Sequence, residues 1–521
     1  MLPRLVAFTT LCFISCLSFA EESKPEDKPH CEAPLSQPRE ESVVTSHTVT
    51  IDGKEISYTA KAGTLLFKDD AGKPKAELFY VSYSKDKPEE GRPVAFCFNG
   101  GPGSCSVWLH LGLLGPKKVL LDSSGVPVKP FALQDNAYSL LDMSDLVFID
   151  PISTGYSKTL CGEDPKKYYG YEEDIQSVGE FIRLYLTKEN RWTSPKFVIG
   201  ESYGTTRAVG LSSYLYNNKL ISIDGIILIS SVLNFQTLSL ENGPFSIPSN
   251  DLPFYLSLPS YTATAAYYKL LPQEMMNSVK DTLKEVEEFV LHDYAEALLQ
   301  GNALSPDKRN AIIAKLCQYT GLSSELIDRL NLRIDTPSFT KEILRKQGKV
   351  VGRFDTTYAG ISANKALPCA ETDPCMDAIT TAFTATINNY LRQNLGWKEE
   401  EEYQILANVF PWKFGSAMNQ YLDVSVDLAT LLSQSPSTQV FLASGIYDLA
   451  TPYFATDYTL SHLPLDPRLQ SHVTHKLYPS GHMMYLHQPS LIKLKQDMAS
   501  FIQATTSPAG KKPLSAENKQ K

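Results

Sequence analysis

Five residues, Gly200-Glu201-Ser202-Tyr203-Gly204, constrain the fold of this chain more than any other stretch. They follow the apolar run Phe197-Val198-Ile199, which is typical of a buried strand, and precede the helix-like segment 208–216. Where a strand turns directly into a helix, the residues two before and two after the central one approach each other, so both must be small. The pattern predicts a tight turn that exposes the Ser202 hydroxyl at the start of a helix, where the helix dipole favours negative charge.

Strands and helices alternate on both sides of this turn. Short apolar runs bounded by Gly, Pro or Asp predict buried strands, and 174–187 between two of them has helical spacing. The predicted strands are 43–50, 56–67, 78–83, 94–98, 146–150, 197–200, 226–229, 439–444 and 472–478. This alternation predicts an α/β fold with a mostly parallel central sheet covered by helices, and an antiparallel pair at its beginning.

The strand pattern stops after about residue 240 and returns near residue 439. Helical spacing dominates in between, over 274–321, 380–394 and 418–432. We therefore expect one sheet-based core, 43–240 and 401–505, with a mainly helical insertion, or cap, at 241–400. A separate second domain is the alternative, but it would leave the last strands without a sheet. The polar ends, 21–42 and 506–521, are expected to be a flexible arm and a disordered tail.

The first residues predict an exported protein. Arg4 precedes an uncharged, mostly apolar run, and Ser18-Phe19-Ala20 presents small residues where a signal peptidase reads them. Residues 1–20 are therefore predicted to be a signal peptide, with an uncleaved anchor as the alternative. We expect a secreted or periplasmic protein with no membrane span in the mature chain. Its oligomeric state stays open.

Charge and cysteine content exclude several other functions. The chain has 49 Lys and Arg against 58 Asp and Glu and no basic tract, which argues against nucleic acid as a partner. It has nine cysteines, but Cys-x-x-Cys and His-Glu-x-x-His are absent, so we expect neither metal nor cofactor. Cys369 and Cys375, with five residues between them, are the best candidates for a local disulfide, and free thiols are the alternative.

The exposed serine suggests nucleophilic catalysis. A serine hydroxyl needs a neighbouring base that is oriented by a carboxylate, and in this architecture the order along the chain is Ser, Asp, His. Asp448 follows the predicted strand 439–444, and His482 follows the predicted strand 472–478. The sequence therefore predicts a triad of Ser202, Asp448 and His482. Asp457 and His487 are the alternatives, and both resemble helix or surface positions.

A glycine-rich loop, Asn99-Gly100-Gly101-Pro102-Gly103, follows the predicted strand 94–98. Glycines at this density let backbone N–H groups point at an anion without a Cβ in the way. Folds with this type of turn build the oxyanion hole from such a loop and from the amide after the nucleophile. The amides of Gly101 and Tyr203 are the candidates, and a plain tight turn is the alternative.

Several blocks in this order resemble the serine carboxypeptidase family of α/β-hydrolases. The blocks are Asn99 to Ser104, Asn136-Ala137-Tyr138-Ser139, Asp150-Pro151 through Ser157, Gly200 to Gly204, Gly445 to Asp448 with Thr451-Pro452, and Gly481-His482-Met483 with Gln488-Pro489. The resemblance covers about residues 43–505. It implies cleavage of peptide substrates at the C-terminus through an acyl-enzyme on Ser202, without cofactor or metal, and makes Asn99, Gly100 and Glu201 candidate substrate-binding residues.

The chain also departs from the family pattern. Cys97 stands where the family usually has Trp, and Leu113 stands where it usually has a Glu that pairs with the Glu beside the nucleophile to hold the substrate carboxylate. A cation could replace that partner, and His110, three residues before Leu113, is a candidate to contact Glu201 or the substrate. A packed His110 and substrates without a free carboxylate are the alternative. An esterase, an acyltransferase or an inactive binding protein on the same scaffold also stay possible.

Overall fold

The computed structural model describes residues 40–69, 71–238, 250–415 and 420–507. The predicted signal peptide, most of the predicted arm and nearly all of the predicted tail lie outside these residues. Within the four described ranges, no helix combines the length and the apolar character that crossing a membrane requires.

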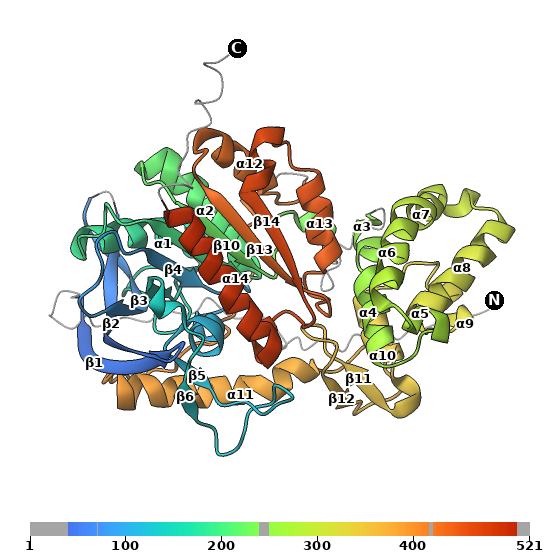
Figure 1. The fold of residues 1–521 in the computed structure, drawn as a ribbon, viewed down its shortest axis with the longest axis horizontal. Coiled ribbons are helices and arrows are strands. Elements are labelled where there is room, and N and C mark those ends of the chain that lie inside the picture. Colours follow the sequence, from blue (N-terminus) through green and yellow to red (C-terminus); the bar gives the residue numbers. More distant parts are fainter. Residues whose placement is uncertain (1–39, 70, 239–249, 416–419, 508–521) are drawn as a thin grey trace, which may run out of the picture. The chain divides into compact units, whose positions relative to one another are not determined.

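Ten strands of the described residues form the central sheet (Figure 1). Their order is β1-β2-β3-β7-β4-β9-β10-β13-β14, with the short β8 beside β3. Every neighbouring pair from β7 to β14 is parallel, whereas β1, β2 and β3 pair antiparallel with one another and β3 pairs antiparallel with β7. The strands are Ser42–Ile51, Lys54–Lys68, Pro74–Lys85, Asp145–Ile149, Val94–Phe98, Lys196–Glu201, Gly225–Ile229, Gln439–Gly445 and Val473–Tyr478 in sheet order, with β8 at Lys158–Thr159. The sheet is mostly parallel, as predicted.

Helices cover both faces of this sheet (Figure 1). One apolar cluster joins the strands to α1 (Tyr171–Lys188), α2 (Tyr203–Lys219) and α12 (Ser425–Gln434). A second cluster joins them to α14 (Gln488–Thr506) and to a π-helical turn, η1 (Leu109–Leu114). Successive residues of β4 alternate between the two clusters, as the two-residue period of a strand requires. The central strands are therefore apolar on both faces, which explains their continuous apolar runs.

The chain between β10 and β13 holds most of the remaining helices and forms its own apolar cluster. These helices are α3 Leu252–Leu256, α4 Leu258–Tyr267, α5 Gln273–Met276, α6 Val279–Phe289, α7 Ala295–Gln300, α8 Pro306–Thr320, α9 Ser324–Arg329 and α10 Thr336–Glu342. Side chains of α13 (Tyr453–Ser461), which follows β13, complete the cluster.

The next helix along the chain, α11, behaves differently. Ile379, Phe383 and Ile387 of α11 (Pro374–Asn389) pack with the sheet and η1, not with the other inserted helices. Between α10 and α11 the chain forms a small hairpin, β11 (Lys349–Val351) and β12 (Ala359–Ile361). A second hairpin, β5 (Lys117–Val119) and β6 (Leu133–Asp135), follows η1. Helices α3 to α10 of the inserted chain thus pack with one another, whereas α11 packs against the sheet.

The predicted disulfide between Cys369 and Cys375 is wrong, because both thiols are free. Asp373 caps α11 by accepting hydrogen bonds from the amides of Cys375 and Met376. This cap directs Cys375 into the core, where it is buried, while Cys369 stays exposed on the preceding loop. Cys161, in contrast, is disulfide-bonded.

Candidate active site

The chain turns from β9 into α2 at Ser202, as the sequence predicts. Ser202 has φ 60° and ψ −132°, a backbone conformation that residues other than glycine adopt rarely. A Cβ on Gly200 would lie 2.1 Å from the carbonyl oxygen of Gly204, and a Cβ on Gly204 would lie 2.9 Å from that of Asn99. Both glycines are therefore required by close backbone contacts, and Ser202 is the half-buried residue at the tip of the turn.

Asp448 and His482 meet across the ends of β13 and β14. Oδ2 of Asp448 lies 2.7 Å from Nδ1 of His482. The same carboxylate accepts hydrogen bonds from the amides of Ala450 and Thr451, at 2.7 and 3.0 Å, and from the Thr451 hydroxyl, at 2.7 Å. These bonds fix the carboxylate, which places the imidazole proton on Nδ1 and leaves Nε2 as a base.

The other ring nitrogen of His482 has no fixed partner. Nε2 is buried, and it has no hydrogen-bond partner among the described residues. Burial disfavours the imidazolium, but the charge and hydrogen bond of Asp448, aided by Glu201, outweigh burial and raise the pKa of His482. Ser202 and His482 line one cavity of about 400 Å³. A base and a hydroxyl therefore face the same space.

The glycine-rich loop after β4 lies against the start of α2. A Cβ on Gly100 would lie 2.4 Å from the amide nitrogen of Tyr203, so only glycine permits this approach. Gly101 has φ +103°, again a conformation for glycine. The backbone N–H groups of Gly101 and Tyr203 make no hydrogen bond to a backbone carbonyl in the turns and loops that the structure describes. Both residues line the cavity beside Ser202.

Glu201 also lines the cavity, and its carboxyl group is buried beside His482. The hydroxyl of Tyr485 lies 3.2 and 3.0 Å from its two carboxylate oxygens. Burial raises the pKa of Glu201 to about 7, while the charge of His482 and the hydrogen bonds from Tyr485 and Asn99 act in the opposite direction. Glu201 is thus a carboxyl group that exchanges its proton near neutral pH.

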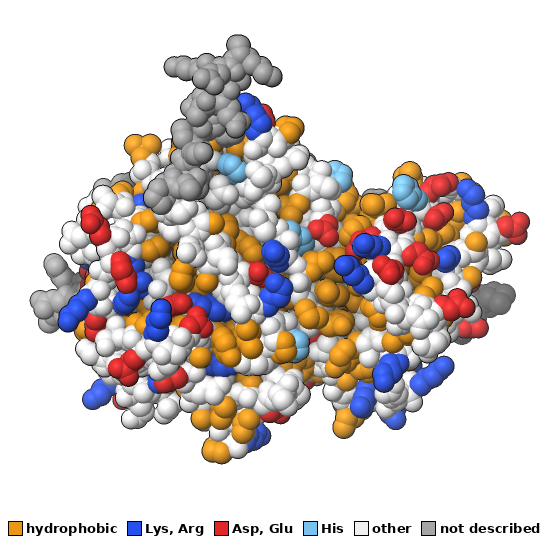
Figure 2. Space-filling model, in the orientation of Figure 1, with side chains coloured by type: hydrophobic (Ala, Val, Ile, Leu, Met, Phe, Trp, Pro, Cys, Tyr) orange, Lys and Arg blue, Asp and Glu red, His pale blue; other side chains and the backbone are white. Residues whose placement is uncertain are grey.

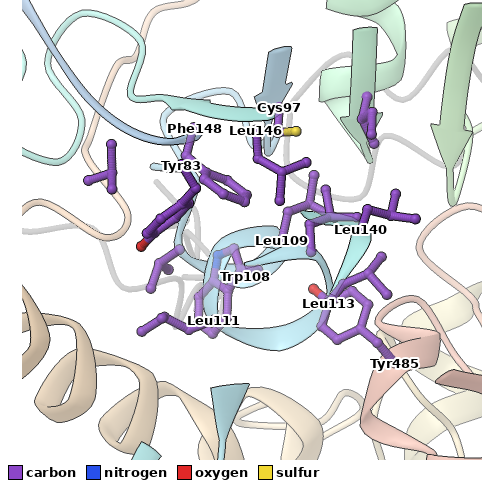
Figure 3. Close-up of a cluster of buried hydrophobic side chains, with 14 of the residues drawn as sticks. Tyr83, Cys97, Trp108, Leu109, Leu111, Leu113, Leu140, Leu146, Phe148 and Tyr485 are labelled. Atoms are coloured by element: carbon purple, nitrogen blue, oxygen red, sulfur yellow. The ribbon is translucent and has the colours of Figure 1, made fainter. Parts of the chain in front are cut away.

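The suggested role of His110 is wrong. Its Nε2 lies 2.6 Å from the Tyr83 hydroxyl, and its ring stacks on Phe148 with the centroids 4.3 Å apart. Burial lowers its pKa to about 3, so its imidazole is uncharged at neutral and mildly acidic pH. Figure 3 shows the apolar cluster of this region, with Tyr83, Phe148 and Leu113. His110 is therefore packed in the core, as the alternative interpretation had it. The other candidate substrate-binding residues, Asn99, Gly100 and Glu201, do line the cavity.

The two alternative triad residues lie elsewhere. Nδ1 of His487 lies 2.8 Å from the Ser490 hydroxyl, at the start of α14. Oδ1 of Asp457 lies 2.8 Å from Nδ1 of His475, whose Nε2 lies 2.9 Å from the Ser444 hydroxyl. This second Ser–His–Asp contact has a fully buried serine near the end of β13, so a substrate cannot reach it.

Some residues of the site carry no sequence signal. Phe354 and Asp355, just after β11, hold the loop of His482: the His482 amide donates to the Phe354 carbonyl at 2.6 Å, and the Gly481 amide donates to the Asp355 carboxylate at 2.9 Å. Arg353 lines the cavity. These residues lie in the inserted chain, where no motif marks them, and only the three-dimensional contact reveals them.

The surface carries charge of both signs. On the face shown in Figure 2, Lys and Arg side chains are interspersed with Asp and Glu and do not gather into one basic patch. Within the described residues, no group of three or more His, Cys, Asp or Glu side chains is arranged to hold a metal ion.

Comparison with known proteins identifies the family of this chain. Residues 54–497 match the family model of serine carboxypeptidase. Serine carboxypeptidase-like 29 of Arabidopsis thaliana is 25% identical over 179 residues, which are 33% of this chain and 34% of the plant protein. The chain thus spans about a third of the length of this curated relative.

The structure resembles that of Kex1(delta)p, a prohormone-processing carboxypeptidase from Saccharomyces cerevisiae, with a TM-score of 0.53 and 16% identity over 86% of this chain and 91% of the yeast chain. A weaker likeness, with a TM-score of 0.36 and 11% identity, is to monoglyceride lipase from the same yeast, over 85% of this chain and 95% of that one. The first likeness identifies the α/β-hydrolase fold. Because the family model matches most of its length, this chain belongs to the serine carboxypeptidase family.

Proposed function

We propose that this protein is an exported serine carboxypeptidase, with Ser202 as nucleophile, His482 as general base and acid, and Asp448 as the group that orients the imidazole. One observation carries the proposal: the imidazole of His482 is fixed by Asp448 on one side, while its free Nε2 and Ser202 line the same cavity. This is the arrangement that turns a weak hydroxyl nucleophile into an effective one.

In the proposed reaction, Ser202 attacks the carbonyl carbon of the last peptide bond while His482 takes the hydroxyl proton. The amides of Gly101 and Tyr203 stabilise the negative oxygen of the tetrahedral intermediate. His482 then gives the proton to the leaving nitrogen, and the C-terminal amino acid departs. A water molecule, deprotonated by His482, hydrolyses the acyl-enzyme and restores Ser202.

The lining of the cavity supports an apolar side chain of the substrate close to the scissile bond. Apolar side chains from separate elements line the cavity: Trp108, Val232, Phe235, Met376 and Leu406. Burial of an apolar side chain against them contributes binding free energy at about 25 cal/mol for each Å². Export rests on the apolar run after Arg4, and the disulfide of Cys161 fits an oxidising compartment.

An esterase is the second candidate, because Leu113 leaves Glu201 without the carboxyl partner that the family uses for a substrate carboxylate. A panel of substrates separates the two functions: N-blocked dipeptides with a free C-terminus, the same dipeptides as amides, and p-nitrophenyl esters. A carboxypeptidase prefers the free-acid dipeptides. Preference for esters, with free-acid peptides left uncleaved, would favour the esterase.

Variants test the nucleophile. Ser202→Ala should lower kcat by at least about 1,000-fold and abolish labelling by a fluorophosphonate probe, since the group that forms the acyl-enzyme is gone. Ser444→Ala is the matched control, because Ser444 also contacts a histidine that contacts an aspartate but is fully buried. It should keep both activity and labelling. Retained labelling of Ser202→Ala would refute the assignment.

A further inference from the structure

The cavity beside Ser202 contains one permanent positive charge among the described residues that line it. Its charged or titratable side chains there are Glu201, Tyr203, His482 and Arg353, and burial raises the pKa of the Tyr203 phenol well above its usual range, so that this phenol is uncharged. Glu201 is neutral or negative, and His482 must be neutral to act as a base. Arg353 therefore determines how the cavity responds to an anionic substrate.

The position of Arg353 is fixed through its neighbours. It follows β11, and its amide donates to the Asp373 carboxylate at 2.6 Å. Its guanidinium carbon lies 4.8 Å from the centroid of the Phe354 ring, a cation–π contact. The Phe354 ring in turn packs edge-on against the His482 imidazole, with the centroids 5.0 Å apart. Arg353 thus lies next to the ring that supports the catalytic imidazole.

The guanidinium of Arg353 has no anionic partner in the described structure: no described carboxylate lies within ion-pair distance of it. The carboxylate of Asp373 is hydrogen-bonded to the backbone amide of Arg353 and not to its guanidinium. It also accepts hydrogen bonds from the amides of Phe354, Cys375 and Met376. Other arginines differ, since Arg207 pairs with Asp174 and Arg333 pairs with Asp251. A guanidinium presents paired N–H donors that match a carboxylate, so this one is available to a ligand.

We propose that Arg353 binds the α-carboxylate of the substrate's C-terminal residue. The inference rests on the proposed function and names the group that selects its substrates. His482 must deliver its proton to the leaving nitrogen, and the α-carboxylate lies on the carbon bonded to that nitrogen. Arg353, which lies beside the Phe354 ring and lines the same cavity as His482, is therefore the cation available to the group that distinguishes a chain end from an internal peptide bond. Arg353 is thus the substrate-binding cation that we expected His110 to be.

The test compares one N-blocked dipeptide as the free acid and as the C-terminal amide, with wild type, Arg353→Gln and Arg353→Lys. For Arg353→Gln we expect the ratio of kcat/KM on the free acid to kcat/KM on the amide to fall at least about tenfold, mainly through KM on the free acid. Arg353→Lys keeps the charge and should recover part of the ratio. Arg345→Gln, which removes a guanidinium paired with Glu342, should leave the ratio unchanged.

The possible outcomes separate the two proposals. Equal losses of Arg353→Gln on both substrates overturn the role of Arg353 while the proposed function stands. Failure of the wild type to cleave free-acid peptides, with esters cleaved, overturns the proposed function instead. A third dipeptide with Asp before the scissile bond tests the rival ligand: if the loss is confined to that peptide, Arg353 recognises an acidic side chain and the inference is wrong. Fluorophosphonate labelling of Arg353→Gln verifies that the variant is folded.

Discussion

The hydroxyl of Tyr485 is hydrogen-bonded to both carboxylate oxygens of Glu201, at 3.2 and 3.0 Å. Both side chains are buried, and the Tyr485 ring lies so close to Gly112 that a Cβ there would be 2.4 Å from a ring carbon. Figure 3 shows Tyr485 beside Leu113, the residue that replaces the family glutamate. A phenol therefore satisfies the carboxyl group for which the sequence offers no acidic partner.

This contact should set the pH dependence of peptide cleavage. Hydrogen bonds from Tyr485 stabilise the ionised form of Glu201, whose pKa is about 7. Tyr485→Phe removes them and should raise that pKa further. Because ionised Glu201 repels a substrate carboxylate, the decline of kcat/KM at high pH should move to higher pH in the variant. The pH profile of kcat/KM on a free-acid dipeptide measures this shift.

A control separates this effect from general loss of a buried phenol. Tyr478 is also buried and donates to a carboxylate, that of Asp497, at 2.8 Å, but it does not line the cavity. Tyr478→Phe should leave the pH of the decline in place. If the decline in Tyr485→Phe stays fixed or moves to lower pH, Glu201 does not control it.

The protonation of Glu201 should also appear in the stability of the fold. Its pKa is raised from 4.5 to about 7, so between these values the folded state keeps a proton that the unfolded state has lost. Stability therefore falls as pH rises through this window, by up to about 1.4 kcal/mol for each pH unit. Glu201→Gln removes this dependence.

Urea unfolding of both proteins across this range is the measurement. The difference in free energy of unfolding, variant minus wild type, should grow from pH 5 to pH 7 and then level off. A difference that is constant across this range would contradict the raised pKa.

Much of the core could be predicted because local patterns determine it. The strands of the parallel sheet are buried on both faces, so each one is a short apolar run that is easy to recognise. The turn at Ser202 could be predicted because two backbone contacts exclude any Cβ at Gly200 and Gly204. The residues proposed as the triad follow strand ends, and the topology brings those ends together.

What could not be predicted depends on contacts between distant segments. The position of Arg353 follows from a hairpin and a helix cap in the inserted chain, neither of which has a motif. His110 seemed suitable because helical spacing would place it on the same side as Leu113. The segment is a π-helical turn, and the buried hydroxyl of Tyr83 holds the imidazole inside the core. Burial thus decided against a residue that spacing favoured.

Asp355 should position His482, the proposed general base, without touching the substrate. Its carboxylate accepts from the Gly481 amide at 2.9 Å and from the amide and hydroxyl of Thr357. Asp355→Ala leaves these donors without partners, and we expect kcat to fall about tenfold or more with KM little changed. Steady-state kinetics on a free-acid dipeptide measures the split.

Asp457→Asn is the matched control for Asp355→Ala, since Asp457 contacts the other histidine, His475, outside the cavity. It should keep the wild-type kcat. An Asp355→Ala variant with wild-type kcat would show that the loop of His482 is held by its remaining contacts, such as that between its amide and Phe354.

The last prediction concerns the ion pair beneath the turn at Ser202. Arg207 of α2 lies 2.7 Å from Asp174 of α1, and both side chains are buried. Arg207 also donates to the carbonyl of Asn99, in the proposed oxyanion loop, at 2.5 Å, and Asp174 accepts from the Tyr203 hydroxyl at 3.3 Å. The pair therefore joins two helices to the loop that supplies the Gly101 amide.

Arg207→Met should destabilise the protein by about 3–5 kcal/mol, because it leaves a buried carboxylate without its cation. Burial already raises the pKa of Asp174 despite Arg207, and loss of Arg207 raises it further. In the variant, Asp174 keeps a proton in the folded state that it loses in the unfolded state, so the loss of stability of Arg207→Met should shrink as pH falls.

Two further variants serve as controls. Arg207→Met combined with Asp174→Asn should recover part of the stability. Arg183→Met, which breaks the more exposed pair with Glu180, should cost less than about 1 kcal/mol. Urea unfolding at pH 5 and pH 8 checks all three, and a deficit of Arg207→Met that is small or grows towards low pH would rule out an unpaired Asp174 as its cause.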